Sequence, residues 1–155
     1  MKLVFDEMLK RTATWCRILG IESEYFTDKT DSELLEYAKS NNFTLVTRDV
    51  QLASRCKKHE VKCIFIKSNV VEEQIAQIIS ESGVEVSFPE RTRCPVCNGE
   101  LEVVSPESLK DEIPEDAYAS KKKVWKCKNC GKAYWEGSHW KNIEKFYQRI
   151  KKLLR

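Results

Sequence analysis

Short apolar runs alternate with helically spaced apolar residues through the first 90 positions of the chain. The runs predict strands over residues 2–5, 24–26, 43–47 and 61–66. The segments between and after them carry apolar side chains on one helical face and predict helices over residues 8–19, 31–38, 49–56 and 70–82. Strands that alternate with helices across short links are typical of a parallel sheet with right-handed crossovers, so we expect an α/β fold with helices flanking the sheet.

The pattern changes after residue 90. Short strands are predicted over residues 101–104, 124–126 and 132–135, and the charged stretch after the first of them is expected to be an insertion loop with a helical turn. The chain then ends in a predicted basic amphipathic helix with Ser138 as its N-cap. The residues of this helix that we expect to pack on the rest of the fold are Ile143, Phe146, Ile150 and Leu153.

Four of the seven cysteines form two Cys-x-x-Cys pairs, and each pair is followed closely by a glycine. Four thiolates around one ion make a closed tetrahedral zinc site, whose binding energy folds a module too small to bury a core of its own. The same residues leave an iron–sulfur cluster and two disulfides open as alternatives. The expected ligands of a structural zinc ion are Cys94, Cys97, Cys127 and Cys130. We therefore divide the chain into an α/β domain, residues 1–90, and a zinc ribbon with a C-terminal helix, residues 91–155.

The composition is typical of a globular chain, with 41% hydrophobic and 33% charged residues among 155. No apolar run approaches the roughly 18 residues that a membrane helix needs, so we expect a cytoplasmic protein with no membrane partner. Three cysteines, Cys16, Cys56 and Cys63, stand singly and are expected in the core.

Charge is distributed unevenly along the chain. Residues 1–90 carry 12 Lys and Arg against 15 Asp and Glu, whereas residues 91–155 carry 15 against 9. Most of the positive charge lies after residue 119, where Trp135, His139 and Trp140 also occur. Basic and aromatic side chains together suit the attraction of phosphates and the stacking of bases, while a solvated helix face explains the charge equally well. RNA contact through these three residues is therefore one of two open interpretations.

Three aspartates occupy matching positions in the α/β pattern. Asp6 follows the first predicted strand, Asp31 begins the helix after the second, and Asp49 follows the third. Ligands bind beyond the carboxyl ends of parallel strands, so these carboxylates should converge, although each one alone is also explained as a helix cap. Clustered carboxylates favour Mg²⁺ or Mn²⁺, and such ions support phosphodiester hydrolysis. No glycine-rich phosphate loop is present, which excludes the P-loop and Rossmann classes.

Six segments spread over nearly the whole chain resemble one known family, the Mut-seven C-terminal RNases. They are residues 4–9 (VFDEML), 15–20 (WCRILG), 31–35 (DSELL), 45–49 (LVTRD), 93–99 (RCPVCNG) and 134–140 (YWEGSHW). The resemblance implies a PIN-like α/β domain followed by a zinc ribbon, and a metal-dependent ribonuclease in which Asp6, Asp31 and Asp49 match the acidic positions.

PIN nucleases usually offer one more acidic residue. The candidates for that position here are Glu7, Asp28 and Glu36. The expected phosphate contacts are Arg11, Arg17 and Arg48. Two other functions stay open: a non-catalytic RNA-binding adaptor associated with ribosomes or tRNA, and a toxin-like nuclease with a dedicated protein inhibitor.

Overall fold

The computed structural model describes residues 1–120, 122–137 and 139–154, so the predicted N-cap Ser138 lies outside the described residues. Its strands are β1 (Leu3–Phe5), β2 (Ser23–Tyr25), β3 (Thr44–Thr47), β4 (Cys63–Phe65), β5 (Leu101–Val104), β6 (Val124–Cys127) and β7 (Ala133–Trp135). Its α-helices are α1 (Lys10–Ile18), α2 (Asp31–Asn41), α3 (Val50–Lys58), α4 (Val71–Ser82), α5 (Glu115–Ala119) and α6 (His139–Leu153). Two 3₁₀ turns are η1 (Glu7–Leu9) and η2 (Pro106–Leu109). Within these ranges no helix is long and apolar enough to cross a membrane.

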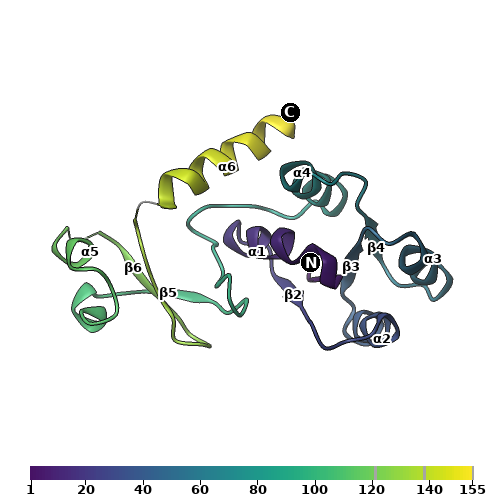
Figure 1. Cartoon of the computed structure of the whole chain (residues 1–155), viewed down its shortest axis with the longest axis horizontal. Helices are drawn as coiled ribbons and strands as arrows, with labels where there is room; N and C mark the ends of the chain where they lie inside the picture. Colours follow the sequence, from purple (N-terminus) through teal and green to yellow (C-terminus); the bar gives the residue numbers. More distant parts are fainter. Residues whose placement is uncertain (121, 138, 155) are drawn as a thin grey trace.

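The first four strands form one parallel sheet in the order β2-β1-β3-β4. Phe5 at the end of β1 is paired with Tyr25 on one side and with Val46 on the other. Because successive strand residues point to opposite faces, Leu3 and Phe5 pack under α1 and α4, whereas Val4 packs under α2 and α3. Figure 1 shows the two helix layers on either side of the strands. The predicted α/β fold with a flanked parallel sheet is confirmed.

The second sheet is antiparallel, in the order β5-β6-β7; Cys127 ends β6, Cys130 lies in the link from β6 to β7, and Cys94 and Cys97 precede β5. The charged segment between β5 and β6 has more structure than the insertion loop we expected. It forms η2 and α5, and the buried side chains of Leu109, Ile113 and Ala117 pack on Val124 and Ala133. These three residues recur every four positions, a helical spacing that the surrounding charges obscured in the sequence.

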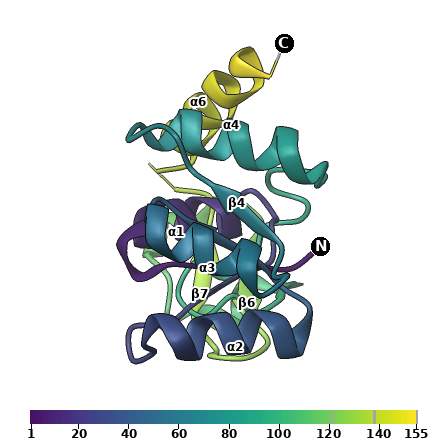
Figure 2. The ribbon, with the colours of Figure 1, turned by 90° about the vertical axis from the view of Figure 1, so that its right-hand side faces the viewer.

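Helix α6 packs mainly on the α/β half, and Trp140 in its first turn also stacks on Trp125 of the ribbon. Figures 1 and 2 both show it lying beside α4. Phe146 and Ile150 are buried in the same core as Leu3 and Phe5, and the Phe146 ring stacks on Trp15 with the ring centroids 3.8 Å apart. The expected packing of Leu153 is wrong: its side chain is 50% exposed, because it lies at the free end of the helix.

Candidate functional site

Asp6 lies at the carboxyl end of β1 and is only 7% exposed. Its backbone N–H continues the sheet by donating to the carbonyl of Val46 at 2.9 Å. Its carboxylate oxygen Oδ2 accepts a hydrogen bond of 2.7 Å from the hydroxyl of Thr47, the last residue of β3. A buried carboxylate is thus fixed in orientation by the neighbouring strand.

The same hydroxyl also accepts a hydrogen bond of 2.9 Å from the backbone N–H of Asp49. Asp49 is the N-cap of α3, and its Oδ1 accepts from the N–H groups of Gln51 and Leu52. Thr47 therefore links the two acidic positions that follow β1 and β3. Thr47 was not among the predicted site residues, although its position at a strand end and two residues before Asp49 is a usable signal.

Asp6 and Asp49 lie where the strand order of the sheet reverses. The chain passes from β1 to β2 on one side of β1 and then returns to place β3 on the other side. In open parallel sheets, ligands bind at such a point, beyond the carboxyl ends of the strands. The structure therefore brings two of the three predicted aspartates to the edge where chemistry is expected.

The third aspartate is placed differently. Asp31 is exposed in the first turn of α2, and the N-cap is its neighbour Thr30. Thr30 forms a capping box with Glu33, in which each side chain bonds the backbone N–H of the other residue. No hydrogen bond in the described ranges joins Asp31 to Asp6 or Asp49.

The additional acidic candidates are all exposed. Glu7 comes directly after Asp6, and its carbonyl accepts a 2.5 Å hydrogen bond from the hydroxyl of Tyr25. Burial, together with the charges of Glu7 and Asp6, raises the pKa of Tyr25, which therefore stays a donor at neutral pH. Asp28 lies in the link before α2, and Glu36 accepts from Ser40 within α2. Among the described residues, the acidic side chains do not form a metal-sized group of three.

The predicted phosphate contacts fall into two kinds. Arg48 and Arg11 are exposed, and Arg48 immediately precedes Asp49. Arg17 is buried, and its guanidinium donates to the carbonyls of Ser23, Pro95 and Val96. Burial lowers the pKa of Arg17, an effect that the nearby charge of Glu24 opposes. These contacts tie α1 to the first cysteine pair, which is a structural role.

The four cysteines of the ribbon form the metal-sized group that the acidic residues do not. All four sulfur atoms lie within 4.8 Å of one another, with Cys94 3.7 Å from Cys130 and Cys97 3.4 Å from Cys127. Tetrahedral zinc–thiolate bonds place sulfur atoms about 3.8 Å apart, so the spacing and the soft donors fit zinc. All four thiols are free of disulfides. The cluster is closed, because no ligand position is left for a substrate.

Hydrogen bonds within the cluster shift the pKa values of two cysteines in opposite directions. Burial raises the pKa of Cys97, but hydrogen bonds from Asn129 and Cys127 outweigh it and bring the pKa to about 6. At Cys130 a backbone hydrogen bond with Lys132 lowers the pKa, but burial and the contacts with the other three cysteines raise it to about 11. Two backbone N–H groups, those of Asn129 and Cys130, point to the sulfur of Cys127 at 3.4 Å. The hydroxyl of Tyr134 lies 2.9 Å from the sulfur of Cys94, and burial and this contact raise the pKa of Tyr134.

Two of the three residues expected to meet RNA at the ribbon are engaged in packing. Trp140 stacks on Trp125 with centroids 5.4 Å apart and leans on Phe88 at 4.7 Å. Trp135 packs partly buried on the ribbon core. His139 is exposed at the start of α6. The stack around Trp140 joins the ribbon to the α/β half and so explains this tryptophan without a ligand.

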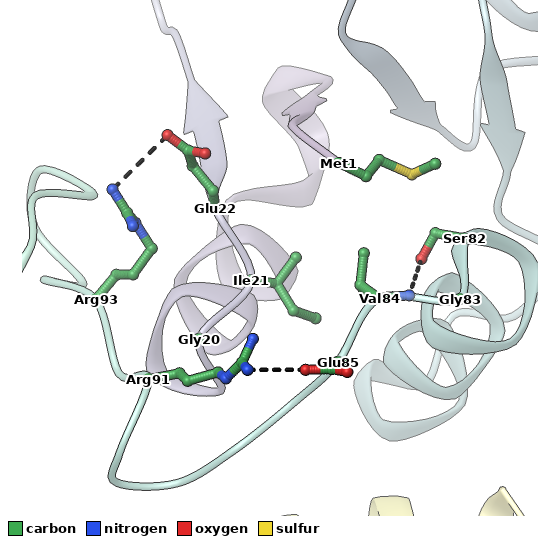
Figure 3. Close-up of a pocket in the computed structure, with 10 residues that line it drawn as sticks. All are labelled: Met1, Gly20, Ile21, Glu22, Ser82, Gly83, Val84, Glu85, Arg91 and Arg93. Atoms are coloured by element: carbon green, nitrogen blue, oxygen red, sulfur yellow. Dashed lines mark hydrogen bonds and ion pairs between the residues drawn. The ribbon is translucent and has the colours of Figure 1, made fainter.

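One cavity of about 440 Å³ lies at the opposite, amino edge of the sheet. Figure 3 shows Met1, Gly20 and Val84 on its walls, with Arg91 paired to Glu85 at 2.8 Å and Arg93 to Glu22 at 3.7 Å. Its charged groups are paired with one another, and none of the predicted site residues lines it.

Comparisons with known proteins give one match. The family model described as Mut7-C RNAse domain matches residues 1–147. No curated protein and no solved structure matches the chain. Because the family match spans the parallel sheet, the four-cysteine ribbon and most of α6, this chain belongs to the Mut7-C RNase domain family.

Proposed function

We propose that the chain is a ribonuclease that depends on Mg²⁺ or Mn²⁺ and acts at the edge formed by Asp6 and Asp49. Membership of an RNase domain family implies a ribonuclease and an RNA substrate. The location of the active site is proposed from the pair of hydrogen bonds through which Thr47 links Asp6 to Asp49. This pair lies at the reversal of strand order, where parallel sheets bind ligands.

The donors at this edge fit a hard divalent cation. Mg²⁺ is commonly held by only one or two carboxylates, together with water and substrate phosphate oxygens. Asp6 and Asp49 would hold the ion, and Asp31 would approach from the first turn of α2. A bound ion of this kind orients a water molecule and neutralises charge on the leaving oxygen.

The chain's own residues have separate parts in this proposal. Thr47 fixes the Asp6 carboxylate by donating to its Oδ2. Arg48 and Arg11 are exposed and would bind phosphates of the RNA backbone. The four cysteines would hold a structural zinc ion, because their closed sulfur cluster suits it.

Asp6→Asn tests the catalytic assignment. The amide keeps the volume of the carboxylate but lacks its charge, so we expect cleavage of a labelled RNA in Mn²⁺ to fall by about a hundredfold or more. The matched control is Asp111→Asn, which changes an exposed aspartate of the ribbon insertion. Cleavage that survives Asp6→Asn in a nuclease-free preparation would remove the assignment.

One observation favours a second function. Asp31 is exposed and forms no hydrogen bond to the other two aspartates within the described ranges, so the acidic set is less compact than the zinc cluster. An RNA-binding adaptor without catalysis is consistent with this arrangement. RNA that binds the wild-type chain but stays uncut in both Mg²⁺ and Mn²⁺ would favour the adaptor.

A further inference from the structure

A second cavity, of about 380 Å³, lies where the ribbon meets the α/β half. We call it the knuckle groove and define it by Lys10, Thr14, Arg17, Tyr25, Pro95 and Val96. Its floor comes from α1, one wall from β2, and the other wall from the turn between Cys94 and Cys97. Two parts of the chain that are distant in sequence thus build one concave surface.

The far wall of the groove is held in place by buried contacts. Arg17 donates from Nη1 to the carbonyls of Pro95 and Val96, at 2.9 and 3.3 Å. Asn98, also buried, accepts from the backbone of Ser23 through its side chain. The turn between Cys94 and Cys97, anchored in this way and held by a metal ion, would form a rigid wall of the groove. On this turn, Val96 is 60% exposed.

The groove lies next to the acidic edge. Tyr25 lines the groove, and its hydroxyl donates to the carbonyl of Glu7, the residue after Asp6. Lys10 lines it as well and begins α1 directly after the 3₁₀ turn that starts at Glu7. Anything bound in the groove would therefore extend toward Asp6.

We propose that the knuckle groove binds the nucleotide of single-stranded RNA that adjoins the scissile phosphate. Lys10 would contact the phosphate on that side, and the Tyr25 ring and the exposed Val96 would contact the base. This inference rests on the proposed function for the position of the scissile phosphate. It means that the turn between Cys94 and Cys97 contacts the substrate directly.

Charge favours RNA as the occupant. The edge formed by Asp6, Glu7 and Asp49 repels phosphates, so a strand that crosses it needs positive side chains nearby. Lys10 supplies such a charge and is exposed, while Arg17 adds a second positive charge at the base of the groove. An aromatic ring beside an apolar side chain suits a base that is not paired, because a single strand leaves its base faces free.

The test measures RNA binding apart from cleavage. All variants are made in the Asp6→Asn background, so that the RNA stays intact, and the dissociation constant for a fluorescein-labelled oligouridylate is measured by anisotropy. The groove variants are Lys10→Gln and Val96→Asp. Each has a matched control far from the groove: Lys39→Gln in the last turn of α2, and Val103→Asp, which changes a valine of the same ribbon that is 63% exposed. Zinc content is measured for every variant to show that the ribbon is intact.

We expect each groove variant to raise the dissociation constant by roughly fivefold or more and each control to leave it unchanged, on the scale of one lost stacking or phosphate contact. Lys10→Gln should also lower the slope of log K against log salt by about 0.7, the value of one phosphate contact on a single strand. Unchanged binding by both groove variants would overturn the inference and leave the proposed cleavage untouched. If wild-type protein cuts no RNA but the groove variants still weaken binding, the proposed function fails and the groove stands as an RNA site.

Discussion

The Thr47 side chain accepts one hydrogen bond and donates another, and its two partners are both candidate catalytic positions. It has no exposed surface, so water cannot replace either bond. The hydroxyl oxygen lies 2.7 Å from Oδ2 of Asp6, an ordinary distance for a hydrogen bond between two oxygen atoms. At the residue scale, the two candidate acidic positions are therefore linked by a neutral, buried side chain.

Replacing this hydroxyl gives a sharp prediction. Thr47→Val keeps the shape of the side chain but removes both hydrogen bonds, so we expect cleavage to fall about tenfold to a hundredfold. The free energy of unfolding should fall by about 1 to 3 kcal/mol, because a buried carboxylate loses its donor. Thr47→Ser retains the hydroxyl and is the control. A Thr47→Val enzyme that cleaves at the wild-type rate would show that the link between Asp6 and Asp49 has no catalytic role.

Some of these residue positions could be predicted from the sequence and others could not. Asp49 stands before apolar residues at helical spacing, and the expected helix cap is confirmed. The capping box of Thr30 and Glu33 also has a local signature, which the choice of Asp31 overlooked. By contrast, Thr47 bonds Asp6, which is 41 residues away along the chain, and Arg17 bonds Pro95, which is 78 residues away. Such pairs depend on which strands become neighbours, and a local pattern carries no information about that.

At the element scale, the ribbon is held by its cysteines and by the small core that η2 and α5 complete. Among the described residues, the buried side chains of that core are small or medium in size: Leu109, Ile113, Ala117, Val124 and Ala133. A core of this size is small against the conformational entropy of the segment, so a metal ion held by the four cysteines would supply the remaining stability.

Metal removal tests this dependence. We expect one zinc ion per chain by atomic absorption, and treatment with a zinc chelator should unfold the ribbon while the α/β half keeps its helices in circular dichroism. The Trp125–Trp140 stack should separate, with a change in tryptophan fluorescence. Cys97→Ser should reproduce the chelated state, whereas Cys63→Ser, at a cysteine outside the cluster, should not. A chain that keeps its ribbon without metal would contradict the assignment.

Helix α6 packs into the core of the α/β half, although the ribbon lies between the two in the sequence. The pattern of apolar residues predicted this helix and the packing of its stripe, but it did not identify the α/β core as the surface on which the helix packs. Phe146 and Leu153 differ in burial, 3% against 50% exposed, since Phe146 meets Trp15 and Leu153 lies beyond the contact. Helix α6 is thus buried in the core at Phe146 and Ile150 but not at its last residue, Leu153.

The two residues make a matched pair for a stability measurement. Phe146→Ala should lower the free energy of unfolding in urea by about 3 to 5 kcal/mol, the range for a buried Phe, because it leaves a cavity under Trp15. Leu153→Ala should change it by about 0.5 kcal/mol or less. Equal effects would mean that α6 does not contribute to the core through Phe146.

At the scale of the whole molecule, acidic residues predominate in the first 90 positions and basic residues in the remainder, and the fold brings these two regions into contact. The α/β half is acidic and the ribbon with α6 is basic, yet α6 lies against the acidic half, where Arg149 pairs with Glu72 at 3.4 Å. Three further basic side chains of α6, those of Lys141, Lys145 and Lys152, are exposed. If the chain binds RNA as proposed, these lysines would attract its phosphates.

Salt dependence tests whether RNA contacts these lysines. Binding of RNA by the Asp6→Asn protein should weaken steeply as salt rises, because each phosphate that is neutralised contributes a slope of about −0.7 in log K against log salt. Changing Lys141 and Lys145 to Gln should make the slope shallower by about 1 to 1.5. Changing Lys57 and Lys58 in the last turn of α3 to Gln is the control and should leave the slope as it is. A flat salt response in the parent protein would exclude a role for the lysines of α6.

The burial of Phe146 and Ile150 among residues of β1 has a consequence for how the protein is made. Ribosomes release a chain from its amino end, so the sheet, its flanking helices and the whole ribbon emerge before α6 does. During that interval Leu3 and Phe5 belong to a core that lacks one of its walls. Completion of the core of the α/β half therefore follows synthesis of the ribbon. A nascent chain that already carries the candidate catalytic residues thus completes its core only after the ribbon and α6 have been translated.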